Sequence, residues 1–179
     1  MTEKKDIRSE VRRRIKLLTS SEMTTASERI FDKIEQLESF HKAECIALFA
    51  SMHDEVATAV VLGRWPKFGK RIVVPRVEGD IMRFYDYSED RMRTGAFGIL
   101  EPEGDVECPA EDIDLIIVPA RAFTRAGERM GRGGGFYDKY MSLPGFRAHK
   151  TGIAFECQIF DTLPTDPHDI KVDEVVTEK

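Results

Sequence analysis

The amino-terminal part of the chain carries apolar side chains at the spacing of amphipathic helices. Residues 3–18 hold one such stripe, made by Ile7, Val11, Ile15 and Leu18. Residues 21–38 hold a second, made by Met23, Ala26, Ile30, Ile34 and Leu37, and Ser20 or Ser21 is placed to cap this helix. We therefore expect two helices before the first strand.

Short apolar runs replace the helical pattern from residue 45 onward. The predicted strands are CIALFAS at 45–51, RIVVPRV at 71–77, MRFYDYS at 82–88, IDLIIVPA at 113–120, TGIAFE at 151–156 and VDEVVT at 172–177. A helical segment is expected around 57–65, and a Gly-rich loop followed by a short helix over 131–142. The alternation predicts an α/β sandwich with a largely parallel sheet, in which IDLIIVPA is central and MRFYDYS is an antiparallel neighbour.

The composition narrows the class of protein. A chain of 179 residues with 41% hydrophobic residues is expected to form one domain, over residues 1–179, with a sizeable core. Its three cysteines, Cys45, Cys108 and Cys157, are too few and too far apart for a disulfide scaffold or a paired-cysteine zinc site, so we expect packing roles. The sequence shows neither a membrane span nor an apolar leader segment, which favours a soluble cytoplasmic protein.

The charge distribution is uneven. The net charge of -5 argues against nucleic acid as a partner. Residues 1–16, however, carry seven Lys or Arg against three Asp or Glu, and residues 121–132 carry four Arg against one Glu. The net acidity therefore conceals two cationic segments and does not argue against a small anionic ligand. In a parallel α/β sheet, ligands are expected at the carboxyl ends of strands, here after residues 51, 75 and 119.

The segment GERMGRGGGFYDKYM at 127–141 is the richest in candidate chemistry. Gly131, Gly133, Gly134 and Gly135 can expose backbone N–H groups to one anion, and the helix expected next adds a partial positive charge. Arg129 and Arg132 offer planar donors to phosphate or carboxylate, and Asp138 is placed in the first helical turn, where it can hold hydrated Mg²⁺. The motif is neither a P-loop nor a dinucleotide fingerprint. A flexible loop without ligand is the alternative.

Other candidate residues have two interpretations each. Lys4 and Arg8, one helical turn apart, form either a cleft edge or a solvated basic face. Asp54 is expected to cap the helix after the first strand, whereas Glu55 can cap it or accept hydrogen bonds from a ligand. Asp173 is either an ordinary loop residue or a second carboxylate near a metal. No histidine pair has metal-ligand spacing, and no GxSxG elbow provides a nucleophile.

The ordered set of segments resembles the 5-formyltetrahydrofolate cyclo-ligase family, also called methenyltetrahydrofolate synthetases. The segments that carry the resemblance are KxxxR at Lys4 and Arg8, SMHDEVAT at 51–58, VVPR at 73–76, FGILEPEG at 97–104, DLIIVP at 114–119, GERMGRGGGFYDKYM at 127–141, GIAF at 152–155, Gln158, LP at 163–164 and HDIKVDEVVTE at 168–178. The similarity spans nearly the whole chain, and the combination is specific although no single segment is.

The resemblance implies a Rossmann-like three-layer α/β fold of the sugar-isomerase and CoA-transferase type. It also implies ATP-dependent cyclisation of 5-formyltetrahydrofolate to 5,10-methenyltetrahydrofolate, with ADP and phosphate released. ATP would be bound by Lys4, Arg8, Arg129, Gly131, Arg132, Gly133, Gly134, Gly135, Phe136 and Tyr137. The folate would be bound by Ala50, Glu55, Arg132, Gly133, Gly134, Gly135 and Phe136. Mg²⁺ would be bound by Asp138 and Asp173.

The implied partners are therefore ATP and 5-formyltetrahydrofolate, with no nucleic acid and no membrane, and the expected state is a monomer, with a dimer as the alternative. Some positions depart from the commonest family pattern, namely Ala120, Arg121, Thr124, Arg132, Gly134 and Phe136. A folate- or nucleotide-binding protein without catalysis is the second hypothesis. An RNA-binding module built on the basic first helix is the third, and the acidic remainder of the chain argues against it.

Overall fold

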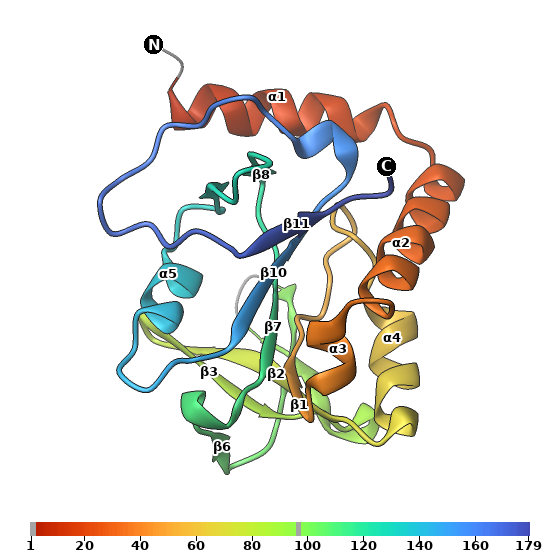
Figure 1. The fold of residues 1–179 in the computed structure, drawn as a ribbon, viewed down its shortest axis with the longest axis vertical. Coiled ribbons are helices and arrows are strands. Elements are labelled where there is room, and N and C mark those ends of the chain that lie inside the picture. The colour runs from red at the N-terminus through yellow and green to blue at the C-terminus, as the bar shows by residue number, and fades with distance from the viewer. Residues whose placement is uncertain (1–2, 96–97) are drawn as a thin grey trace.

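The computed structural model describes residues 3–95 and 98–179, so Phe97 of the FGILEPEG segment lies outside the described residues (Figure 1). The α-helices are α1 (Lys4–Lys16), α2 (Ser20–Ile34), α3 (Glu38–Lys42), α4 (Ala59–Arg64) and α5 (Phe136–Met141). The first two helices confirm the pattern that predicted them, with shorter bounds.

The described residues form a seven-stranded sheet in the order β11-β10-β7-β1-β2-β3-β6. Its strands are β1 (Cys45–Ala47), β2 (Arg71–Glu78), β3 (Ile81–Asp86), β6 (Glu107–Cys108), β7 (Leu115–Val118), β10 (His149–Ile153) and β11 (Glu174–Val176). The pairs from β11 to β2 are parallel, whereas β3 is antiparallel to both of its neighbours. The prediction of a largely parallel sheet with an antiparallel excursion at β3 is confirmed. Two small antiparallel pairs stand apart, β4 (Met92–Thr94) with β5 (Leu100–Pro102), and β8 (Ala122–Phe123) with β9 (Arg129–Met130).

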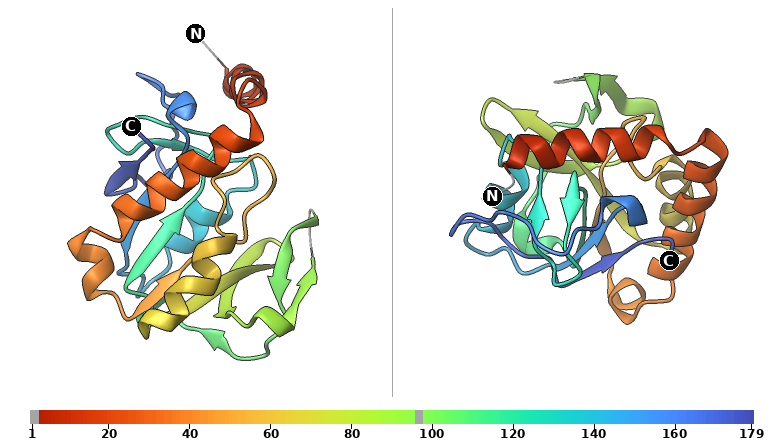
Figure 2. Two further views of the ribbon diagram at one scale, coloured as in Figure 1. Left: turned by 90° about the vertical axis from the view of Figure 1, so that its right-hand side faces the viewer. Right: turned by 90° about the horizontal axis from the view of Figure 1, so that it is seen from above.

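The alternation of side chains along the strands gives the sheet two buried faces. Ile46, Ile72 and Ile117 face a core closed by α2, α3 and α4, which includes Phe31 and Trp65. Their neighbours on the same strands, such as Ala47 and Val118, face a second core with Tyr140 and Met141 of α5. Helices therefore cover both faces of the sheet, as the three-layer prediction requires (Figures 1 and 2).

Helix α1 belongs to neither face and lies across the carboxyl end of the sheet (Figures 1 and 2). Its buried residues Ile7, Val11 and Ile15 pack against Ala122 and Met130 of the β8–β9 pair. Because this packing fixes the helix beside the strand ends, the polar face of α1 is brought next to the Gly-rich loop that follows β9.

Several local predictions need correction. Helix α2 is capped by Thr19, not by Ser20 or Ser21, because only Thr19 forms the reciprocal capping box with Glu22. The helix ends at Ile34, and Leu37 occupies the N-cap position of α3 instead of continuing α2. The middle strand of the sheet is β1, with β7 beside it, so IDLIIVPA is an interior strand but not the central one.

The cysteines are free thiols, and Cys45 and Cys108 are buried with their Sγ atoms 3.9 Å apart. Their place in the second core confirms the expected packing role for Cys45. Among residues 3–95 and 98–179, the structure contains no helix that is long and apolar enough to cross a membrane.

Candidate active site

A cleft of about 890 Å³ opens at the carboxyl ends of the parallel strands. Residues directly after β1 and β7 form its floor, including Ala50 and Ala120, and Pro75 and Val77 of β2 extend it. Helix α1, the Gly-rich loop and α5 form its walls. This volume is within the range of sites for cofactors and other small ligands.

The Gly-rich loop connects β9 to α5 through backbone conformations that favour glycine. Gly133 has φ 116°, and Gly135 has φ 71° in the N-cap position of α5. A side chain at either position would strain the backbone, so the loop owes its shape to these glycines. The exposed loop lines the cleft, and Asp138 lies in the first turn of α5, as predicted.

Arg129 is the buried cation beneath this loop, with a side chain 5% exposed. It donates to the backbone oxygen of Pro119 at 3.1 Å and to Asp138 Oδ1 at 3.4 Å, while its Nε is buried without a partner among the described residues. Burial lowers the pKa of Arg129, and the charge of Asp138 opposes this effect. A guanidinium with an unsatisfied donor beside the cleft is suited to an incoming anion.

Asp138 is held by one oxygen only. Its Oδ1 accepts the backbone N–H of Ile170 at 3.0 Å and the weaker bond from Arg129. Within the described ranges, no protein donor binds Oδ2. A carboxylate that is anchored through one oxygen, lies 20% exposed and lines a cleft can offer the other oxygen to a hydrated divalent cation.

The two basic residues of α1 lie at the edge of the cleft. Arg8 Nε donates to the backbone oxygen of Gly131 at 3.0 Å, which ties α1 to the Gly-rich loop. Lys4 forms an ion pair with Asp166 at 2.7 Å. Both residues line the cleft, so the cleft-edge interpretation is correct, whereas Arg12 and Arg13 of the same helix are exposed.

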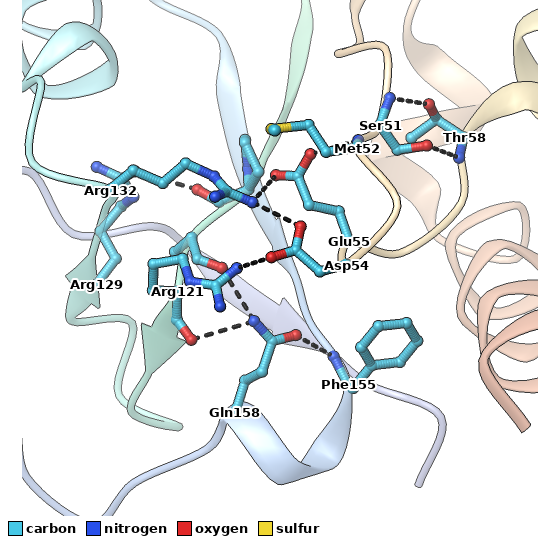
Figure 3. A network of polar contacts seen from close by, with 12 residues as sticks. Ser51, Met52, Asp54, Glu55, Thr58, Arg121, Arg129, Arg132, Phe155 and Gln158 are labelled. Atoms are coloured by element: carbon cyan, nitrogen blue, oxygen red, sulfur yellow. Dashed lines mark hydrogen bonds and ion pairs between the residues drawn. The ribbon is translucent and has the colours of Figure 1, made fainter. Parts of the chain in front are cut away.

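Opposite the Gly-rich loop, Asp54 connects two arginines (Figure 3). Arg121 Nη1 donates to its Oδ2 at 2.9 Å, and Arg132 Nη2 donates to its Oδ1 at 2.9 Å. The same nitrogen of Arg132 lies 3.7 Å from Glu55 Oε2, and Glu55 Oε1 accepts the backbone N–H of Met52 at 2.8 Å. The loop after β1 is thereby joined to the Gly-rich loop across the cleft.

Adjacent carboxyl groups in this network have pKa values shifted in opposite directions. Burial disfavours the charged form of Asp54, but Arg132 and Arg121 outweigh burial and lower its pKa. Burial is dominant for Glu55 and raises its pKa, although the Met52 N–H and Arg132 oppose it. Glu55 is thus a poorly solvated acceptor facing the cleft, a state that is common at functional sites.

The capping role predicted for Asp54 is wrong. Helix α4 begins at Ala59, its N-cap is Thr58, and Asp54 lies four residues too early to reach the first free N–H groups. The loop is closed instead by reciprocal bonds, from Ser51 N–H to Thr58 Oγ1 at 3.0 Å and from Thr58 N–H to Ser51 Oγ at 2.9 Å.

The predicted site residues gather in this cleft with one exception, Asp173, which is outside the cleft lining. The others that line it are Lys4, Arg8, Ala50, Glu55, Arg129, Gly131, Arg132, Gly133, Gly134, Gly135, Phe136, Tyr137 and Asp138. Asp173 Oδ2 instead accepts the backbone N–H of Lys150 at 2.8 Å, at the amino ends of β10 and β11. The structure therefore does not bring the two predicted magnesium ligands into one cleft.

Some residues in or beside the cleft were not assigned a role there from sequence. Arg121 and Asp54 belong to the polar network beside the cleft. Glu101 lines the cleft and is only 6% exposed, with Oε2 accepting the Val77 N–H at 2.9 Å. An acid within the strand-like LEP run is the sequence signal for Glu101. Asp166, His168 and Asp169 also line the cleft, and their ligand atoms lie within 4.8 Å of one another. No local signal pairs Arg121 with Asp54, because 67 residues separate them.

Comparisons with known proteins identify the family of the chain. The chain is 32% identical to a mouse 5-formyltetrahydrofolate cyclo-ligase, over 98% of this chain and 93% of the relative. It is 28% identical to the Escherichia coli K12 protein of the same name, over 93% and 96%. The solution structure of Aquifex aeolicus 5,10-methenyltetrahydrofolate synthetase superposes with a TM-score of 0.87 and 34% identity, over 98% of this chain and 90% of that chain. Because the family model also matches residues 1–178, the chain belongs to the 5-formyltetrahydrofolate cyclo-ligase family.

Proposed function

We propose that this cleft carries out the ATP-dependent closure of 5-formyltetrahydrofolate to 5,10-methenyltetrahydrofolate, with release of ADP and phosphate. The observation that carries the proposal is that one cleft is lined both by a Gly-rich loop flanked by Arg129 and Arg132 and by Glu55, an acceptor whose side chain is only 14% exposed. Family membership agrees with it. We further propose that residues 1–179 act as a single domain, working as a cytoplasmic monomer.

The nucleotide end of the cleft is proposed to lie between α1 and the Gly-rich loop. Backbone N–H groups of residues 131–135 would surround phosphate oxygens, and Lys4, Arg8, Arg129 and Arg132 would neutralise their charge. All four of these cations already hold a carboxylate or carbonyl, such as Asp166 for Lys4 and Gly131 O for Arg8. A bound phosphate would then replace these protein partners. Because an anion of the wrong shape could not replace them all, its affinity would be lower.

The folate end is proposed to lie against the loop after β1. Glu55 has the position and the chemistry to accept N–H donors from a pterin ring, and Ala50 leaves room for the flat ring beside it. The shared loop residues Arg132, Gly133, Gly134, Gly135 and Phe136 would touch both ligands. The formyl group and the terminal phosphate are thereby directed to the same place.

Mg²⁺ is proposed to accompany ATP and to reduce the charge of its phosphates. The free oxygen of Asp138 fits this role, because Asp138 lines the cleft beside the loop. The assignment of Asp173 to the metal has the support of the family resemblance alone. Because Asp173 lies outside the cleft lining and accepts the Lys150 N–H, its role is tested separately from that of Asp138.

The proposed chemistry requires alignment and charge neutralisation instead of a protein nucleophile. The formyl oxygen attacks the γ-phosphorus, the bond to the β-phosphate oxygen breaks, and ADP leaves. N10 of the folate then attacks the activated carbon and loses its proton, and the C–O bond breaks to release phosphate. The arginines and the loop N–H groups stabilise the charge on the transferring phosphoryl group, and the apolar floor limits competing attack by water.

The test is the MgATP-dependent appearance of the methenyl chromophore in the near ultraviolet, with ADP release measured in parallel. We expect one ADP for each methenyl product formed. Binding of ATP and 5-formyltetrahydrofolate by calorimetry, without ADP release or chromophore, would establish the non-catalytic alternative and reject the proposed reaction.

A further inference from the structure

Arg121 is a buried cation whose backbone and side chain are both held by hydrogen bonds. The residue is 4% exposed, its N–H donates to Met130 O at 2.8 Å, and its carbonyl accepts from Gln158 Nε2 at 3.1 Å. Its side chain then reaches Asp54 Oδ2 at 2.9 Å. Since the main chain is tied to β9 and to Gln158, the guanidinium is a rigid support for Asp54 (Figure 3).

Arg132, the other partner of Asp54, is held much less firmly. Its side chain is 42% exposed, and its bonds within the described residues are made by Nη2 alone, to Asp54 and more distantly to Glu55. It lies in the Gly-rich loop and lines the cleft, whereas Arg121 is outside the lining. Arg132 is thus the member of the network that can exchange its partner for a ligand.

The charge balance of this network indicates how Arg121 would help Arg132 to exchange its carboxylate partner for a ligand. The network holds two carboxylates and two guanidinium groups, and it is balanced while Arg132 rests on Asp54. When Arg132 turns away, Arg121 still neutralises Asp54, so a single uncompensated carboxylate remains. Without Arg121, both carboxylates would hold Arg132 and would together oppose an approaching phosphate.

We propose that Arg121 is a positioning residue that fixes and neutralises Asp54, so that Arg132 can leave the two carboxylates for the phosphates of ATP. This inference rests on the proposed function, because it takes ATP as the anion. It assigns no contact with the ligand to Arg121 itself.

The experiment measures the Kd for MgATP by calorimetry without folate, so that turnover plays no part. Arg121→Met is expected to weaken ATP binding about tenfold, and Arg121→Lys to retain most of the affinity because the charge stays. The decisive variant is Arg121→Met with Asp54→Asn. Removing the excess negative charge is expected to restore the Kd to within about threefold of wild type.

Arg125→Met is the matched control, since Arg125 is four residues away and its exposed side chain pairs with Glu156 outside the cleft. Its Kd is expected to equal that of wild type. An unchanged Kd in Arg121→Met, or a double variant that is folded yet binds no better than Arg121→Met, would overturn the inference. If Arg121→Met does not fold, the Kd of Asp54→Asn for MgATP tests the inference. Because this variant removes a negative charge that opposes phosphate, weaker ATP binding in it would contradict the inference. Wild type that binds no ATP would reject the proposed function itself.

Discussion

Asp114, at the amino end of the sheet, differs from Asp138 and Glu55, at the carboxyl end, in how completely the protein occupies its carboxylate oxygens. At the amino end, Asp114 Oδ2 accepts the backbone N–H groups of Glu44 and Cys45, both at 2.9 Å, and its Oδ1 accepts from Arg147 at 2.7 Å. At the carboxyl end, Asp138 is anchored through one oxygen. Glu55 Oε2 lies 3.7 Å from Arg132, which bonds Asp54 more closely. Asp114 thus has both oxygens occupied by the protein, whereas Asp138 and Glu55 line the cleft and keep acceptor capacity there.

The contrast shows that residue type alone does not mark a functional site. A carboxylate with all its oxygens bonded contributes to stability, because losing a partner leaves a desolvated group. A carboxylate with a free oxygen in a cleft contributes less to the stability of the ligand-free protein, and a ligand can supply the missing partner. Substitutions that remove the charge and keep the shape should therefore affect stability at one end and ligand use at the other.

The largest effect is expected for Asp138→Asn. The amide keeps an oxygen for the Ile170 N–H, so folding should be preserved, but it is a poor ligand for Mg²⁺. We expect kcat/KM for MgATP to fall about a hundredfold, which corresponds to about 2.7 kcal/mol of lost transition-state stabilisation. The measurement is initial rate against MgATP concentration, with thermal unfolding as a check of the fold.

Asp173→Asn is the matched variant from the amino end. Its carboxylate bonds the Lys150 N–H and lies 3.6 Å from Lys150 Nζ, so we expect near-normal kinetics with a modest loss of stability. Equal losses of MgATP use in the two variants would show that both acids serve the metal, and the distinction between the two ends of the sheet would then not hold for Asp173.

The fold was predictable because burial leaves periodic traces in the sequence. The stripe at Ile7, Val11 and Ile15 located α1, and the apolar run at 115–118 located β7. Boundaries were less accurate where several residues of one type compete for one role. Thr19, Ser20 and Ser21 can all cap a helix, and only the spacing from Thr19 to Glu22 distinguishes the residue that does.

The site was predictable where its residues lie in one segment and not where it depends on distant partners. Arg129, the glycines and Asp138 are contiguous, so their chemistry could be inferred together. The role of Asp54 depends on Arg121, and the position of Asp173 depends on the register of β11 with β10. Neither the pairing nor the register is encoded in local sequence, which explains the wrong cap and why the position of Asp173 outside the cleft lining could not be foreseen.

A smaller effect is expected for Glu55→Gln, which adds an N–H₂ group where the pterin would present donors. We expect KM for 5-formyltetrahydrofolate to rise about tenfold, equivalent to about 1.4 kcal/mol, with a lesser change in kcat. The affinity for ATP without folate should not weaken. A KM for folate equal to that of wild type would remove Glu55 from the proposed folate site.

The pH dependence of Glu55 sharpens this prediction. Because burial raises the pKa of Glu55, it takes up a proton at higher pH in the folded chain than in the unfolded chain. As pH falls through that raised pKa, KM for folate should rise, while the contribution of Glu55 to the free energy of unfolding should increase. Glu55→Gln should abolish both changes. Parallel pH profiles in the two proteins would assign the titration to another group.

The smallest effect on activity is expected for Asp114→Asn, at the opposite end of the sheet. Burial opposes the charged form, but the Cys45 N–H and Arg147 outweigh it and lower the pKa of Asp114, so its stabilisation is present above about pH 4 and is lost as pH falls through the lowered pKa. The variant should lose about 1–2 kcal/mol of unfolding free energy at neutral pH, measured by urea titration, with less acid sensitivity and both KM values within about twofold of wild type. Arg147→Met is the control, and because that side chain is 57% exposed its loss should be under about 1 kcal/mol. A large rise in either KM for Asp114→Asn would mean that the ends of the sheet are coupled, since β1 and β7, which Asp114 joins at their amino ends, also carry the cleft floor at their carboxyl ends.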